Sequence, residues 1–427
     1  MVGRAQLEAL VLKKPLIILA MTTMLAIPSA YSDDALPFTQ ADIDLAKLLR
    51  DDALSGTRAW NIVESLTTEV GPRLAGSAAE ARARDWAVET LTRYGFENVR
   101  VEPFMIEGWR RGEEVAEVVS PFPQKLAITS LGNSVATSQT GVEADVVLFD
   151  SLSSLKAVAD GALDGKIAYV GHGMQRTQDG SSYGHFVRLR SAAAIEAGRR
   201  GAAAVLIRSI GTDSHRMPHT GNMTYAGDVT PIPIAALSNP DADQIERIAA
   251  RGEPLRVKLT LTPSYTGAVQ SGNVVAELPG TDLADEFVVI GGHLDSWDLG
   301  TGAIDDGAGV GITIEVLRRS KEAGLKPRRT IRLVLWGAEE VGLLGGYAYA
   351  EKHKENLRKH VIGTESDFRA GRIWKITRSI NEEARPVADM IAQLVEPLGL
   401  VPGSTDPRAS GPDLTPLNQL GCPGFRF

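Results

Sequence analysis

The sequence is poor in cysteine and histidine. Of its 427 residues, Cys422 is the single cysteine and seven residues are histidines. One thiol excludes an internal disulfide framework and any cysteine-based zinc cluster. Any metal ion must therefore be held by histidine and carboxylate side chains.

An excess of positive charge is also absent. The 45 lysines and arginines face 53 aspartates and glutamates, which gives a formal net charge of −8 and a pI near 5.5. An extended nucleic-acid interface needs a basic face, so we do not expect nucleic acid as a partner. With 43% hydrophobic and 23% charged residues, the composition is that of a globular protein. At about 150 residues per domain, the length predicts two or three domains.

The apolar run near the start of the chain is too short to cross a membrane. It covers residues 15–27, follows three basic residues and precedes a Pro-Ser-Ala site at 28–30. At about 1.5 Å per residue it would fall short of the ~30 Å hydrocarbon core. The pattern is that of a signal peptide over residues 1–30. We therefore expect an exported protein, periplasmic or secreted, with no stable membrane span after cleavage.

The texture of the sequence changes twice along the remaining chain. Residues 39–94 show helical patterns, and short β-rich runs separated by turns fill most of 116–262. From residue 272 onward apolar strands alternate with helices, which is typical of an α/β unit with a largely parallel sheet. We therefore expect an α/β domain in two pieces, 38–115 and 269–427, with a β-rich domain inserted at 116–268.

Histidine and acidic side chains follow the predicted strands of the second α/β piece. His293 and Asp295 come directly after the apolar run 287–290, and the pair Glu339–Glu340 follows the run 331–336. Open α/β sheets bind ligands at the carboxyl ends of their parallel strands. We expect the Asp295 carboxylate, two residues along from the imidazole, to accept the second ring N–H of His293.

Two further acids complete this pattern. Asp305 precedes a glycine-rich loop and a helix, and Asp367 ends a third apolar run. Histidine and carboxylate ligands beside an unligated glutamate indicate a metal site that activates water for hydrolysis. Of the adjacent pair Glu339–Glu340, one carboxylate can bind the metal while the other acts as a base on the water.

These motifs resemble those of a known enzyme family. The segments that carry the likeness are GGHLDSWD (291–298), DDG (305–307), LWGAEE (335–340) and ESD (365–367). They are similar to the M28 family of zinc exopeptidases, in its carboxypeptidase Q-like branch, and the likeness extends over residues 38–423. The resemblance implies a mixed central sheet flanked by helices, with a protease-associated domain inserted at 116–268. It also implies an exopeptidase that cleaves short peptides or dipeptides, and a homodimer.

The resemblance further implies two zinc ions that share a ligand. His293 and Asp367 would hold one ion and Glu340 the other, with Asp305 bridging both. Glu339 would be the general base and then the acid that protonates the leaving amine. A cis peptide bond after Asp305 is also implied.

One ligand of that family pattern is missing. The family takes its last zinc ligand from a histidine downstream of a segment that resembles 421–424, but none of the seven histidines follows Asp367. The His293, Asp305 and Asp367 site is complete, whereas the site of Asp305 and Glu340 lacks its third ligand. We therefore expect a C-terminally truncated catalytic domain without the last strand of its sheet, binding one zinc ion at a complete site.

Two alternatives to hydrolysis stay open. The chain could be a catalytically impaired or non-catalytic peptide-binding protein on the same fold, as the missing ligand would allow. It could also be an M28-type cyclase, which forms a ring without using water. The inserted domain and the Glu339–Glu340 pair favour hydrolysis over cyclisation.

Overall fold

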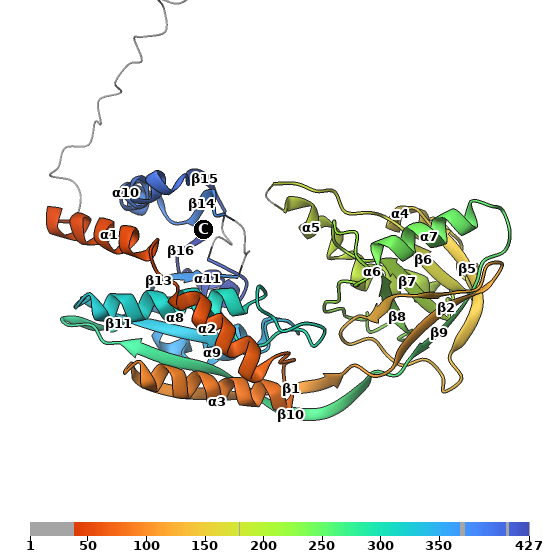
Figure 1. Ribbon diagram of the computed structural model, residues 1–427, viewed down its shortest axis with the longest axis horizontal. Coiled ribbons are helices and arrows are strands. Elements are labelled where there is room, and N and C mark those ends of the chain that lie inside the picture. Colours follow the sequence, from red (N-terminus) through yellow and green to blue (C-terminus); the bar gives the residue numbers. More distant parts are fainter. Residues whose placement is uncertain (1–37, 179, 368–371, 407–409, 427) are drawn as a thin grey trace, which may run out of the picture. The chain divides into compact units, whose positions relative to one another are not determined.

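The computed structural model describes residues 38–178, 180–367, 372–406 and 410–426, which form two mixed sheets (Figure 1). The predicted signal peptide, residues 1–30, lies outside the described residues. Within the described ranges, no helix has both the length and the apolar character that a membrane span requires.

The first sheet is mixed, and its central strands are parallel. Its order is β1-β10-β12-β11-β13-β16-β14-β15. The strands are, in that order, Glu97–Arg110, Ser264–Leu278, Arg329–Trp336, Leu283–His293, His360–Glu365, Gly424–Arg426, Lys375–Ser379 and Val401–Thr405. β11 is parallel to β12 and β13, whereas β10 is antiparallel to β1 and β12. The carboxyl ends of β11, β12 and β13 therefore meet at one edge, as the sequence pattern predicts.

Helices cover both faces of this sheet (Figure 1). On one face α2 (Arg58–Ser65), α3 (Ala78–Arg93) and α8 (Gly307–Glu322) share an apolar core with β10, β11 and β12. On the other face α9 (Leu344–Lys352) and α11 (Thr415–Gln419) pack around Trp336 and Tyr349. A mixed sheet flanked by helices is the predicted fold class. The π-helix η2 (Leu66–Val70) adds Leu66 to the first of these cores, and α10 (Arg385–Val395) packs with Ile376 of β14 and Phe425 of β16. The remaining helical segments are α1 (Gln40–Ala53) and the 3-10 turns η3 (Lys354–Lys359), η4 (Glu382–Ala384) and η5 (Glu396–Leu398).

The second sheet is built from residues that lie between β1 and β10 in the sequence. Its order is β3-β2-β9-β5-β6-β7-β8-β4. The strands are, in that order, Gln124–Leu126, Glu114–Ser120, Arg256–Leu261, Val142–Phe149, Ile167–Val170, Ala204–Arg208, Ile234–Leu237 and Ile128–Ser130. The run β5 to β8 is parallel, and the remaining pairs are antiparallel. This sheet therefore also has a carboxyl edge made of parallel strands.

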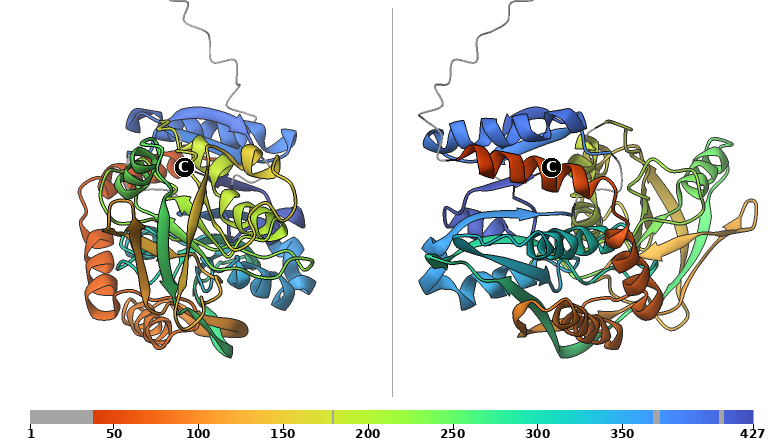
Figure 2. Two further views of the ribbon diagram at one scale, coloured as in Figure 1. Left: turned by 90° about the vertical axis from the view of Figure 1, so that its right-hand side faces the viewer. Right: turned by 60° about the vertical axis from the view of Figure 1, so that its left-hand side comes forward.

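Helices also pack on both faces of the second sheet. α7 (Asn239–Ala249) joins one core, while α4 (Leu152–Lys156) and α6 (Leu189–Arg199) join the other. The left view of Figure 2 turns this sheet toward the viewer, with α7 in green and α6 in yellow-green on either side of the strands. A further short helix, α5 (Ser181–Phe186), precedes α6.

One expectation about the first sheet is wrong. We expected its last strand to be absent, but residues 424–426 form β16, which is parallel to β13 and antiparallel to β14. Phe425 is buried and packs with Ile376 of β14. Three extended residues with one buried aromatic ring are enough to pair with both neighbouring strands.

Candidate metal centre

Three predicted ligands meet at the carboxyl ends of β11 and β13. His293 ends β11, Asp367 follows β13, and Asp305 lies in the loop before α8. The imidazole Nε2 of His293 lies 2.9 Å from Asp305 Oδ1 and 3.4 Å from Asp367 Oδ1. One ligand atom from each of the three residues lies within 4.8 Å of the other two. This spacing allows a single metal ion to contact all three side chains.

Asp306 ties the two halves of this site together, which the sequence analysis did not foresee. Its Oδ2 accepts the backbone N–H of His293 and its Oδ1 accepts that of Gly309, each at 3.0 Å. Asp306 is the N-cap of α8, a position that favours aspartate, so the signal was present in the sequence. The peptide bond between Asp305 and Asp306 is cis, as the family resemblance implied.

The expected contact of Asp295 is wrong. The Nδ1 atom of His293 lies 3.0 Å from the backbone oxygen of Asp295 and 3.8 Å from its carboxylate Oδ1. The carboxylate instead accepts the backbone N–H groups of Glu339, at 3.0 Å, and Glu340, at 3.3 Å. Strand β11 ends at His293, so the two-residue alternation of strand side chains no longer applies at Asp295. The backbone oxygen of Asp295 therefore orients the His293 imidazole, and its carboxylate holds the backbone of Glu339 and Glu340.

The glutamate pair after β12 is half-buried and crowded by like charge. Burial raises the pKa of both Glu339 and Glu340 well above the ordinary value, and neighbouring carboxylates act in the same direction. For Glu340 the largest neighbouring charge is that of Asp305, which raises the pKa of Glu340 further. A bound cation would favour the ionised form of both.

For the His293 imidazole, burial and the neighbouring carboxylates act on the pKa in opposite directions. Burial alone would lower the pKa of His293, but the carboxylates of Asp305 and Asp367 raise it well above the ordinary value. For Asp305, desolvation is the largest single influence and acts to raise the pKa. The hydrogen bond with His293 and the charges of His293, His219 and Arg73 together outweigh it, so the pKa is lowered. The three groups therefore form an electrostatic unit that stabilises positive charge between the carboxylates.

Two further acids, Asp413 and Glu365, are buried and indicate whether a cation fits at this edge of the sheet. Asp413 is fully buried and donates its backbone N–H to Glu365 Oε2 at 2.9 Å. Among the described residues, both carboxylate oxygens of Asp413 and the Oε1 of Glu365 have no hydrogen-bond partner. Burial raises the pKa of Asp413 to about 8 and that of Glu365 well above its ordinary value. A buried carboxylate without a partner costs free energy, and a divalent cation would supply a partner. The oxygens of Asp413 and Glu365 therefore fit a bound divalent cation at this edge.

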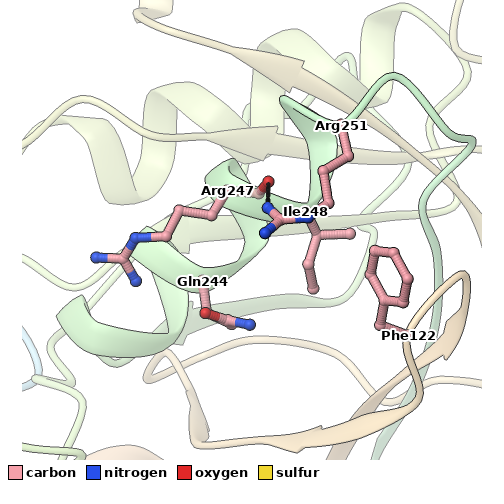
Figure 3. A pocket seen from close by; sticks show the side chains of 5 residues that line it. All are labelled: Phe122, Gln244, Arg247, Ile248 and Arg251. Carbon is pink, nitrogen blue, oxygen red and sulfur yellow. Dashed lines mark hydrogen bonds between the residues drawn. The ribbon is translucent and has the colours of Figure 1, made fainter.

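A cavity lies elsewhere in the molecule and plays no part in this site. It has a volume of about 340 Å³ and is lined by Phe122 and by four residues at and after the end of α7, Gln244, Arg247, Ile248 and Arg251 (Figure 3). Arg251 donates to the backbone oxygen of Arg247 at 2.8 Å. All five residues belong to the second-sheet region, and none is a predicted ligand.

Comparisons with known proteins point to one family. The sequence model described as "Peptidase family M28" matches residues 273–427. The chain is 35% identical to carboxypeptidase Q of Homo sapiens over 384 residues, which is 89% of this chain and 79% of that protein.

Solved structures agree with this family. A peptidase M28 precursor from Shewanella amazonensis SB2B is 45% identical, with a TM-score of 0.88, and the match covers 90% of this chain and 87% of that one. A zinc aminopeptidase from Bacillus subtilis matches with a TM-score of 0.64 at 20% identity, over 87% of this chain and 84% of that one. The second match shows a common fold alone.

Proposed function

Because the chain belongs to peptidase family M28, we propose that it is an exported zinc-dependent exopeptidase that hydrolyses short peptides or dipeptides. The observation that carries this proposal is the meeting of His293, Asp305 and Asp367, whose ligand atoms lie within 4.8 Å of one another. The glutamate pair at the end of β12 is held at the same edge by the Asp295 carboxylate. Carboxypeptidase Q of Homo sapiens, 35% identical, supports peptide hydrolysis at a chain end.

Zinc is the metal that we propose for this site. Histidine nitrogen and carboxylate oxygens are the ligands that catalytic zinc takes in proteins. His293, Asp305 and Asp367 supply one complete set. Glu340, with Asp305 shared, would hold a second ion, as the family resemblance implies. When bound, zinc would polarise the scissile carbonyl and lower the pKa of water.

Glu339 is the proposed general base. Its carboxylate would take a proton from the attacking water and deliver it to the leaving amine nitrogen. The Asp295 carboxylate holds the backbone of Glu339 at 3.0 Å, which fixes the turn from which this side chain projects. A carboxylate whose pKa is raised by burial transfers protons more effectively near neutral pH than an exposed one.

Export, domain division and assembly are part of the same proposal. Residues 1–30 would act as the signal peptide, and 116–268 as a protease-associated domain between the two catalytic pieces, 38–115 and 269–427. The second sheet supports this division, because its strands span residues 114–261 between two neighbouring strands of the first sheet. A homodimer remains a prediction.

Sequencing the amino end of the exported protein tests the signal peptide, and a start before residue 31 would contradict it.

Substrate cleavage and metal content test the proposal together. The purified protein is incubated with dipeptides and with peptides blocked at either the amino or the carboxyl end, and released amino acids are measured. We expect release that stops on chelation and returns with zinc, with at least one zinc ion bound per chain. The blocked peptides then show which free end is recognised. Zinc binding and peptide binding without any release would instead favour a non-catalytic peptide-binding protein.

A further inference from the structure

Arg73 is a buried cation behind the metal centre. It lies in the loop between η2 and α3, and its side chain is fully buried. The guanidinium donates at 3.0 Å or less to three backbone oxygens: Nε to Leu294 at 2.5 Å, Nη1 to Thr301 at 2.6 Å and Nη2 to Gly302 at 3.0 Å. A longer contact, at 3.4 Å, joins Nη1 to the oxygen of Gly71. Within the described part of the chain it forms no ion pair with any carboxylate. A buried charge bound only to backbone oxygens requires a specific explanation.

The three oxygens belong to the two segments that carry the ligands. Leu294 directly follows His293, and Thr301 and Gly302 lie just before Asp305. The Gly302 oxygen also accepts the backbone N–H of Gly307, the first residue of α8, at 2.9 Å. One planar guanidinium therefore joins the end of β11 to the start of α8.

The backbone of Arg73 strengthens this connection. Its N–H donates to Ser296 Oγ, and its oxygen accepts the N–H of Ser296, each at 3.2 Å. Gly302 has a φ of +58°, and a Cβ there would lie 2.8 Å from Arg73 Nη1 and 2.4 Å from Ser296 Cβ. The loop 294–302 is thus packed tightly around the arginine.

The charge of Arg73 also acts on the ligands. Burial lowers the pKa of Arg73 to about 10, against the opposing attraction of four acids, Asp295, Asp306, Asp305 and Glu340. The side chain is therefore cationic at neutral pH. It provides positive charge behind an edge where acids are crowded together.

We propose that Arg73 is a positioning residue that presets the separation of His293 and Asp305 for one metal ion. It acts through the loop 294–302 by binding the Leu294, Thr301 and Gly302 oxygens at the same time. This inference rests on the proposed function only in taking the site to bind a metal. Residues around a metal site that orient its ligands change metal affinity by about 10- to 100-fold when they are replaced.

Metal affinity of the chelator-stripped protein tests the proposal without any peptide substrate. Dissociation constants for Zn²⁺ and Co²⁺ are measured by competition with a chromophoric chelator, and the visible Co²⁺ spectrum is recorded. We expect Arg73→Met to weaken binding about 10- to 100-fold and to change the Co²⁺ bands. Arg73→Lys should weaken binding nearly as much, because one ammonium cannot hold both segments in a planar fork.

Arg200 offers a matched control. It is also buried, and its guanidinium donates to the backbone oxygens of Val158, Lys156 and Glu196 at 2.6–2.9 Å, all in the second-sheet region. Unlike Arg73, it also pairs with a carboxylate, that of Glu196, at 2.8 Å. Arg200→Met should leave metal affinity within about twofold, since this group does not orient a ligand.

Gly302→Ala leaves Arg73 and its charge in place but pushes the loop 294–302 away from the guanidinium. This variant therefore tests the positioning role if Arg73→Met fails to fold. We expect this variant to weaken metal binding as well. Full binding by Arg73→Lys and Gly302→Ala, or equal affinities for Arg73→Met and Arg200→Met, would overturn the positioning role. Failure of the unaltered protein to bind metal would instead contradict the proposed function.

Discussion

Both sheets have parallel central strands, but they differ in how charged side chains are paired at the carboxyl ends of those strands. In the second sheet Arg208, at the end of β7, contacts Asp243 and Glu246 at 2.8 and 2.9 Å, and the Tyr169 hydroxyl donates to Glu246 at 2.8 Å. Arg208 therefore compensates the charges of both Asp243 and Glu246. Topology alone would place a ligand at either edge.

At the first sheet the acids outnumber the cations that face them. Glu339 and Glu340 lie beside other carboxylates, and burial raises the pKa of both. The imidazole of His293 contacts two carboxylates, and Arg73 binds backbone oxygens. A reactive site is distinguished from a structural one by charges that lack partners of opposite sign, more than by where the site lies in the fold.

The largest effect should follow from Glu339→Gln at the uncompensated edge. Removing the base should lower peptide turnover about 10²- to 10⁴-fold, while the bound zinc stays unchanged because Glu339 is not a ligand. Turnover and metal content measured on the same sample check this. The matched control is Glu246→Gln in the second sheet, which should keep turnover. Turnover within tenfold of the unaltered enzyme would exclude Glu339 as the base.

Metal removal should have an intermediate effect that depends on pH. The pKa values of Glu339, Glu340 and Glu365 are raised in the folded chain, so these groups hold their protons more tightly there than in the unfolded chain, where glutamates ionise above pH ~4.3. The metal-free protein must therefore lose stability as pH rises from about 5 to 8. We expect its Tm to fall by roughly 5 °C or more over this range.

Thermal melts with and without chelator measure this difference. A bound cation favours the ionised acids, so the gap in Tm between the metal-loaded and metal-free protein should widen with pH. A gap that stays constant or narrows toward pH 8 would contradict the electrostatic description of this edge.

The smallest effect should come from breaking the compensated edge. Arg208→Met removes contacts to two partners that are each more than 40% exposed, so solvent weakens the loss to about 1 kcal/mol of unfolding free energy. Denaturant unfolding checks this value. Turnover per folded molecule should not change, and a large loss of activity would mean that the second sheet takes part in the reaction.

Local patterns were enough to predict the strands and the acids that follow them. Apolar runs ending in His293, Glu339 and Asp367 are readable because each strand and its terminal side chain are neighbours in the chain. The contact of the Asp295 carboxylate was predicted wrongly for a related reason: the strand, and with it the alternation of side chains, ends at His293, two residues before Asp295. No local pattern marks Arg73, since its oxygen acceptor in Leu294 lies 221 residues away.

The order of residues along the chain thus decides the fold class, the chemical types of the ligands and the edge of the sheet at which they emerge. Each of these follows from periodicity and from strand ends, which depend on a few adjacent residues. The pairing of β16, the burial of Asp413 beside Glu365 and the hold of Arg73 on the ligand loop depend on strand register and on loops that meet only after folding. Contacts of this kind are selected by packing and by the need to satisfy buried polar groups, and that competition is settled in three dimensions.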